Sequence, residues 1–76
     1  MINVKVLGSG CANCKTTFQL IDEITRSKGV EVEIEKVEDM GEIMSYGVMS
    51  TPGVMVGDKL VHSGGIPTRS AIESWF

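Results

Sequence analysis

A long amphipathic helix between two apolar strands is the feature that most restricts the fold of this 76-residue chain. Alternating apolar residues predict a strand over residues 2–7, which a Gly-Ser-Gly turn at residues 8–10 stops. A helix is predicted from about Ala12 to Lys28, and a second strand follows over residues 30–37. Because crossover connections are right-handed, this βαβ unit places its two strands parallel.

The rest of the chain adds a shorter helix, a hairpin and a terminal helix. The shorter helix is predicted over residues 38–46. Strands over 54–56 and 59–62 flank a Gly-Asp turn, which is typical of a β-hairpin. Pro67 suits the first position of the last helix. The residues of that helix expected to face the core are Ala71, Ile72, Trp75 and Phe76. The predicted order is β-α-β-α-β-β-α.

Composition and charge indicate an ordinary globular protein. The chain is 42% hydrophobic and 22% charged, with a net charge of -3. This weak acidity argues against nucleic acid or an anionic membrane as partner. No apolar run approaches the roughly 18 residues of a membrane span, and residues 1–5 do not resemble a signal peptide. We therefore expect a single domain over residues 1–76, monomeric and cytoplasmic.

Both cysteines lie at the predicted strand–helix junction, as Cys11-Ala12-Asn13-Cys14. Residues three positions apart share a face of a helix, so these two thiols can close a disulfide or hold a soft metal. In a reducing compartment such a pair indicates redox catalysis or metal binding rather than a structural cross-link. The unpaired amides of a helix start would lower the pKa of Cys11 from about 8.5 towards roughly 3.5–7.5. Cys14, one turn further, is predicted to face the core and to be shielded.

A closed zinc site is not supported by the ligand count. Structural zinc needs four ligands, whereas this chain has two cysteines and one histidine. That histidine, His62, lies in a predicted strand and is interpreted as a partly exposed strand residue. A two-coordinate copper site, or a metal shared between two subunits, stays open because thiolates suit soft metals.

The chain resembles the small archaeal and bacterial thioredoxin- or glutaredoxin-like redox disulfide proteins. The resemblance is carried by Gly-Cys-Ala-Asn-Cys at 10–14, Tyr-Gly-Val at 46–48 ahead of Ser-Thr-Pro at 50–52, and Gly64-Gly65 before the last helix. It spans essentially the whole chain. It implies a thioredoxin-like α/β fold, with a mixed four-stranded sheet and helices on both faces.

The resemblance also implies a role for each site residue. Cys11 would be the nucleophile and Cys14 the resolving thiol. The Thr51-Pro52 bond would be cis and would face the cysteine pair, leaving the backbone of Thr51 exposed for pairing with a substrate segment. The substrate-binding residues implied in this way are Thr51, Pro52, Ala12 and Asn13.

The function implied is that of a thiol–disulfide oxidoreductase, an electron carrier that reduces protein disulfides. A flavoprotein of the thioredoxin-reductase kind would restore the dithiol, and neither a bound cofactor nor a metal is expected. The alternative is a soft-metal carrier, for copper or an iron–sulfur cluster, that uses the same cysteine pair. Copper chaperones, however, have a different order of helices and strands.

The chain also departs from the family pattern. Ala12-Asn13 replaces the usual residues between the cysteines, and no tryptophan precedes Cys11. Lys5 lies in the strand where thioredoxins bury an aspartate, so the family's proton route does not transfer. Gly64-Gly65 resembles the glutaredoxin loop that holds glutathione, but the acid that usually follows is missing. A turn that starts the last helix is the favoured interpretation, and glutathione binding is left open.

The methionines have a structural explanation. Flexible core packing accounts for Met40, Met44 and Met55, because methionine fills irregular gaps well. Met49, close before Thr51, is expected near the active site.

Overall fold

The structure is a computed structural model, and it describes residues 1–8 and 12–76. Its elements follow the predicted order. They are β1 (Ile2–Leu7), α1 (Ala12–Lys28), β2 (Val32–Val37), α2 (Met40–Ser45), β3 (Gly53–Val56), β4 (Lys59–Ser63) and α3 (Arg69–Trp75). None of the described helices is long and apolar enough to cross a membrane.

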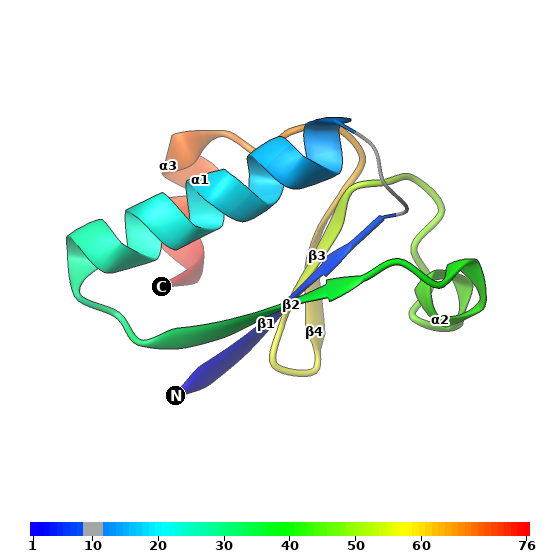
Figure 1. Cartoon of the computed structure of the whole chain (residues 1–76), viewed down its shortest axis with the longest axis horizontal. Coiled ribbons are helices and arrows are strands. Elements are labelled where there is room, and N and C mark those ends of the chain that lie inside the picture. Colours follow the sequence, from blue (N-terminus) through cyan, green and yellow to red (C-terminus); the bar gives the residue numbers. More distant parts are fainter. Residues whose placement is uncertain (9–11) are drawn as a thin grey trace.

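The four strands form a mixed sheet in the order β2-β1-β3-β4 (Figure 1). β1 and β2 are parallel, with Val4 opposite Ile34, which confirms the crossover expected of the βαβ unit. β1 pairs antiparallel with β3, and β3 pairs antiparallel with β4. β2 is an edge strand, and the exposed carboxylates of Glu33 and Glu35 lie along it. Charges on an edge strand discourage pairing with other chains.

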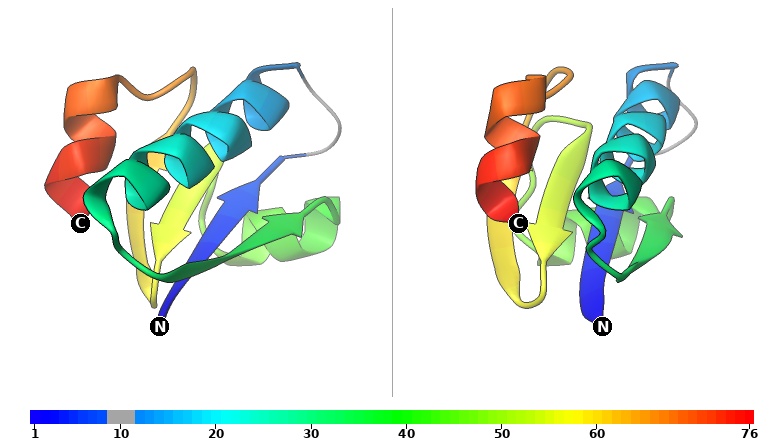
Figure 2. Two further views of the ribbon diagram at one scale, coloured as in Figure 1. Left: turned by 60° about the vertical axis from the view of Figure 1, so that its left-hand side comes forward. Right: turned by 90° about the vertical axis from the view of Figure 1, so that its left-hand side faces the viewer.

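Helices cover both faces of the sheet (Figure 2). α1 and α3 lie on one face, and α2 lies on the other. The α1 side buries Val4, Val6, Ile21, Ile24, Val54 and Ile72. The α2 side buries Leu7, Val37, Ile43, Val48 and Met55. Because side chains alternate along a strand, β1 supplies both cores from neighbouring positions.

Two helices begin later than the sequence predicted, and a capping side chain explains each difference. α2 begins at Met40 rather than residue 38, because the Asp39 carboxylate accepts a hydrogen bond from the Glu42 amide at 3.0 Å. α3 begins at Arg69, because the Thr68 hydroxyl accepts from the Ala71 amide at 3.1 Å. The prediction that Pro67 occupies the first helical position is therefore wrong.

Candidate functional site

Cys14 lies in the first turn of α1, with its side chain turned towards the core. Only 8% of it is exposed, so the predicted orientation is confirmed. It is disulfide-bonded in this structure. The buried Thr17 hydroxyl, in the next turn of α1, donates to the carbonyl of Asn13, the residue before Cys14, at 2.8 Å. Cys11, the predicted nucleophile, lies outside the described residues.

The end of β1 passes directly against the Cys14 sulfur. A methyl group built on Gly8 would overlap Cys14 Sγ and would lie 3.2 Å from Cys14 Cβ. The same methyl would lie 3.6 Å from Thr51 Cβ. The Gly8 amide is held by the Val37 carbonyl at 2.9 Å, so the backbone there is fixed. Gly8 is therefore the point at which strand, disulfide and the Thr51 loop meet.

The Thr51-Pro52 peptide bond is cis, as the family resemblance implied. Pro52 is buried, whereas Thr51 is exposed. Among the residues that the structure describes, neither backbone group of Thr51 has a hydrogen-bond partner. Its N–H and C=O are thus open to an incoming chain. The role of this pair in substrate binding stays a prediction.

The Gly64-Gly65 loop packs against the proline loop. The Gly64 amide donates to the Pro52 carbonyl at 3.0 Å. Gly64 has a φ of 82°, a left-handed conformation that favours glycine, and a Cβ there would also lie close to Ser50 Cβ, at 3.1 Å. The structure thus brings this predicted loop to the side of the site.

His62 is a half-buried strand residue, as predicted. Its Nε2 lies 2.9 Å from the Gly65 carbonyl, and its ring centroid lies 6.1 Å from that of Trp75. It therefore steadies the loop after β4. Within residues 1–8 and 12–76, no three histidine, cysteine, aspartate or glutamate side chains gather closely enough to hold a metal ion.

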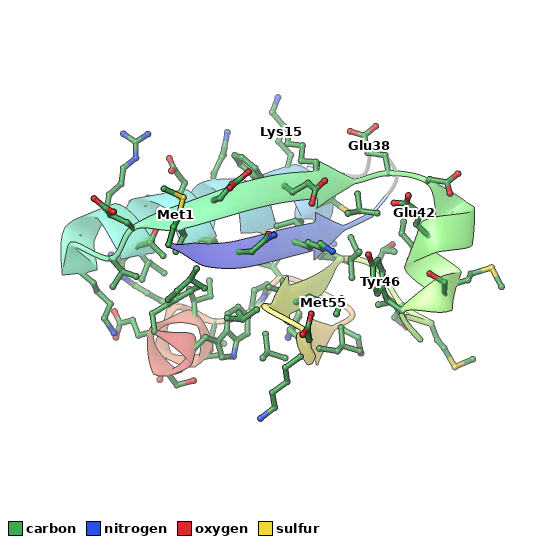
Figure 3. All side chains as sticks on the ribbon, turned by 90° about the horizontal axis from the view of Figure 1, so that it is seen from below. Met1, Lys15, Glu38, Glu42, Tyr46 and Met55 are labelled. Atoms are coloured by element: carbon green, nitrogen blue, oxygen red, sulfur yellow. The ribbon has the colours of Figure 1, made fainter. Side chains whose placement is uncertain are left out.

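A cavity of about 340 Å³ opens beside the Cys14 sulfur, on the side of β2. Its polar lining consists of Lys15, Lys36 and Glu38, from three different segments; Lys15 and Glu38 are labelled in Figure 3. The Lys36 ammonium also lies 4.8 Å from the ring centroid of Phe18, a cation–π contact. Sequence reasoning missed this cluster, because only the β1–β2 register brings residues 36 and 38 to the cysteine.

Lys5 lies on the opposite face of the sheet from α1. Its ammonium donates to the Tyr46 hydroxyl at 3.0 Å and lies 5.0 Å from the centre of that ring. Figure 3 shows Tyr46 between α2 and the sheet. The hydrogen bond to Tyr46, followed by the charges of Tyr46, Glu35 and Asp58, raises the pKa of Lys5 above 10.5, and desolvation opposes it.

The methionine prediction is wrong for two of three residues. Met55 is buried, at 6% exposure, but Met40 and Met44 are 53% and 71% exposed. The short α2 buries Ile43 and leaves the neighbouring methionines beyond the edge of the core. Met49 is 97% exposed and shares a groove with Thr51, Met40 and Met44.

Known proteins provide an independent comparison for this fold and site. Residues 2–76 match the family model described as the thioredoxin domain. A thioredoxin of Methanocaldococcus jannaschii is 34% identical over 73 residues, which cover 96% of this chain and 84% of the relative. A thioredoxin of Methanothermobacter thermautotrophicus is 29% identical over 73 residues, covering 96% and 95% of the two chains.

The chain belongs to the thioredoxin family, as a small member similar to archaeal thioredoxins. The fold predicted from the resemblance is confirmed. Family membership implies a role in thiol–disulfide redox chemistry.

Proposed function

We propose that this protein is a thiol–disulfide oxidoreductase that carries electrons to disulfides of other proteins. The observation that carries the proposal is the meeting of three groups at Gly8: the strand end, the Cys14 sulfur and Thr51. This arrangement sets an exposed backbone segment with open hydrogen-bonding groups beside a redox-active sulfur. A disulfide-bearing chain that pairs with Thr51 would therefore lie next to that sulfur.

The reaction takes two exchange steps. The Cys11 thiolate attacks one sulfur of the target disulfide, forms a mixed disulfide, and expels the other target sulfur as a thiolate. Cys14 then loses its proton and attacks the Cys11 sulfur, which releases the second target thiolate. The target gains two electrons and, with two protons, ends as two thiols, while Cys11 and Cys14 end as a disulfide.

The lining of the cavity supports separate roles for the two cysteines. Cys14 is nearly buried, so it is a poor collision partner for a large target, and its proposed partner is instead the Cys11 sulfur of the mixed disulfide. Lys15 and Lys36 line the same cavity as Cys14, so their charges would favour the thiolate that forms as the Cys14 proton leaves. Ala12 and Asn13 are exposed in the first turn of α1, where they would contact the target.

The relatives carry the name thioredoxin, which supports protein disulfides as substrates and a flavoprotein reductase as electron donor. We infer that the chain acts as a single cytoplasmic domain and as a monomer. The test is reduction of a model protein disulfide, followed by turbidity or alkylation, with dithiothreitol as donor. Wild type should accelerate the reaction and Cys11→Ser should not; equal rates for the two would refute the proposal.

The redox midpoint of the cysteine pair classifies the activity further. It is read in a glutathione or dithiothreitol buffer series from the mass shift on alkylation. A midpoint potential of about -270 mV is that of a thioredoxin-like reductant, and one of about -200 mV indicates a glutaredoxin-like role.

A further inference from the structure

The cavity beside Cys14 has one side chain that can accept a proton, among the described residues that line it. A lysine ammonium has hydrogens to donate and no lone pair, so Lys15 and Lys36 cannot take a proton in their charged form. The carboxylate of Glu38 can. The other described residues of the lining have no side chain that exchanges protons, and they are Val6, Gly8 and Ala12.

Strand alternation places Glu38 on the face of the sheet that α1 covers. Lys36, two residues earlier, makes its cation–π contact with α1. Val37, between the two, packs into the core on the α2 side. The Val37 carbonyl accepts from the Gly8 amide, and Gly8 lies against the Cys14 sulfur. Glu38 therefore directly follows the residue that holds the strand end beside this sulfur.

The Glu38 carboxylate is not engaged elsewhere in the fold. It is exposed, and among the described residues it takes part in no hydrogen bond or ion pair. The neighbouring Asp39 carboxylate, in contrast, is occupied, because it accepts from the Glu42 amide at the start of α2. In Figure 3 the side chains of Glu38 and Lys15 project to the same side of the molecule. Glu38 can thus take up a proton without breaking a contact.

Cys14 needs a proton acceptor close by. It is nearly buried, and it must lose its proton before its sulfur can attack a disulfide. The hydroxyl of Thr17, which is buried in the next turn, already donates to the Asn13 carbonyl. The cavity of about 340 Å³ is far larger than the roughly 10–15 Å³ that one water molecule requires. Water in this cavity can therefore link the sulfur to the Glu38 carboxylate.

We propose that Glu38 is the proton acceptor for Cys14 in the second exchange step. The inference rests on the proposed function, because it assigns a further residue to that reaction. As the Cys14 sulfur attacks the Cys11 sulfur, the Cys14 proton passes through water to the Glu38 carboxylate, and the target sulfur leaves as a thiolate. Glu38 then releases the proton to solvent. When a donor thiolate attacks Cys11 of the disulfide, the proton returns by the same path to the departing Cys14 thiolate.

The experiment isolates this step with the aromatic disulfide of thionitrobenzoate. An excess of the dithiol protein is mixed with the reagent in a stopped-flow instrument. The first thionitrobenzoate is released when Cys11 is modified, and the second when Cys14 attacks Cys11. The second release is intramolecular, so its rate does not depend on protein concentration. Thionitrobenzoate leaves as an anion, so the proton that matters is that of Cys14.

Glu38→Gln should slow the second release about tenfold near neutral pH, less than a directly placed base supplies, because water completes the path. The direction is diagnostic. Loss of a negative charge beside the sulfur would by itself favour the Cys14 thiolate and would speed the step. Glu38→Asp keeps the carboxylate and should stay within about threefold of wild type.

Glu33→Gln is the matched control. It removes the same charge from β2 but on the opposite face of the sheet from Lys36, and it should leave the second release unchanged.

The pH dependence separates a proton-transfer role from a structural one. The charged groups that face Cys14 across the cavity are Lys15, Lys36 and Glu38, and on the side of Gly8 the neighbour is the uncharged Thr51. A cysteine that is already ionised needs no acceptor. The deficit of Glu38→Gln should therefore vanish at about pH 10, above the ordinary range of a thiol. A deficit caused by altered structure would persist there.

The outcomes distinguish this proposal from the proposed function. If wild type releases one thionitrobenzoate and no second, Cys14 does not resolve the mixed disulfide, and the proposed function fails. If the second release occurs and Glu38→Gln matches or exceeds the wild-type rate, the assignment of Glu38 alone is overturned. A deficit that persists at high pH, or an equal deficit in Glu33→Gln, overturns it as well.

Discussion

Gly8 lies so close to Cys14 that no side chain can be added to it. A methyl group at residue 8 would overlap the Cys14 sulfur and would press on Cys14 Cβ at 3.2 Å. The backbone at Gly8 is not in the left-handed region, so steric contact rather than conformation requires the glycine. The strand end is held by Val37, and therefore cannot move aside without breaking the β1–β2 register.

Gly8→Ala should destabilise the protein by about 1–3 kcal/mol and should slow thiol–disulfide exchange, since overpacking displaces either the strand or the sulfur. Denaturant unfolding and the protein-disulfide reduction rate measure the two effects. Gly29→Ala is the control. Its φ of 70° makes alanine cost about 1–2 kcal/mol, but a Cβ there meets nothing within 4 Å. Gly29→Ala should catalyse exchange at the wild-type rate. If Gly8→Ala also catalyses exchange at the wild-type rate, the steric role assigned to Gly8 is contradicted.

Lys36→Gln should lengthen the lifetime of the mixed disulfide roughly two- to fivefold. The reason is that removal of one cation from the cavity costs up to about 1 kcal/mol of attraction to the Cys14 thiolate. Stopped-flow measurement of the second step tests this prediction. The difference from wild type should shrink as salt is raised. Lys59→Gln removes an equal charge from the start of β4 and should leave the step unchanged. An identical effect of the two variants would show that only net charge matters.

Tyr46→Phe should lower the pKa of Lys5 towards its ordinary value, because the hydroxyl supplies the largest contribution to the upward shift. A lysine whose pKa is raised by folding stabilises the folded state fully below pH 10.5. That contribution is lost as the pH rises through the higher folded pKa. The Lys5 and Tyr46 interaction should therefore weaken only under strongly alkaline conditions. Titration of the Lys5 side-chain NMR signals in the two proteins checks this, and coincident curves would contradict it.

Ile21→Val should cost about 0.5–1.5 kcal/mol of unfolding free energy, because Ile21 is fully buried between α1 and the sheet. Ile66→Val makes the same chemical change at a residue that is 44% exposed and should have little effect. Urea unfolding of the two variants measures the difference. Similar losses in both would show that the α1 core is not packed as described.

The sequence was sufficient to predict the elements whose apolar residues repeat regularly. Helix α1 has the predicted bounds, Ala12 to Lys28, because its periodicity and the flanking glycines act together. The parallel pairing of β1 and β2 followed from the long helical crossover between them. The Thr51-Pro52 bond could not be derived from local residues, since X-Pro bonds in folded proteins are cis in only about 5–6% of cases. The family resemblance was needed for it.

Tertiary contacts decided what the sequence could not. Met40 and Met44 were expected in the core, but the sequence does not reveal which residues of a short helix lie beyond the edge of the core. The buried Thr17 and Thr25 were also missed, because each satisfies its hydroxyl within α1, on the carbonyl four residues earlier. The polar lining of the cavity beside Cys14 includes Lys36 and Glu38, which only the β1–β2 register brings there. Residues that serve the site through such contacts have no sequence signature of their own.

Trapping of the mixed disulfide distinguishes the roles proposed for Cys11 and Cys14. Reduced Cys14→Ser is mixed with an excess of a protein that contains a disulfide, and adducts are mapped by mass spectrometry after blocking of free thiols. The proposed roles predict a stable one-to-one adduct through Cys11, and no adduct with Cys11→Ser under the same conditions. Absence of the adduct in Cys14→Ser, or an equal yield from the two variants, would contradict the assignment of Cys11 as nucleophile and Cys14 as resolving thiol.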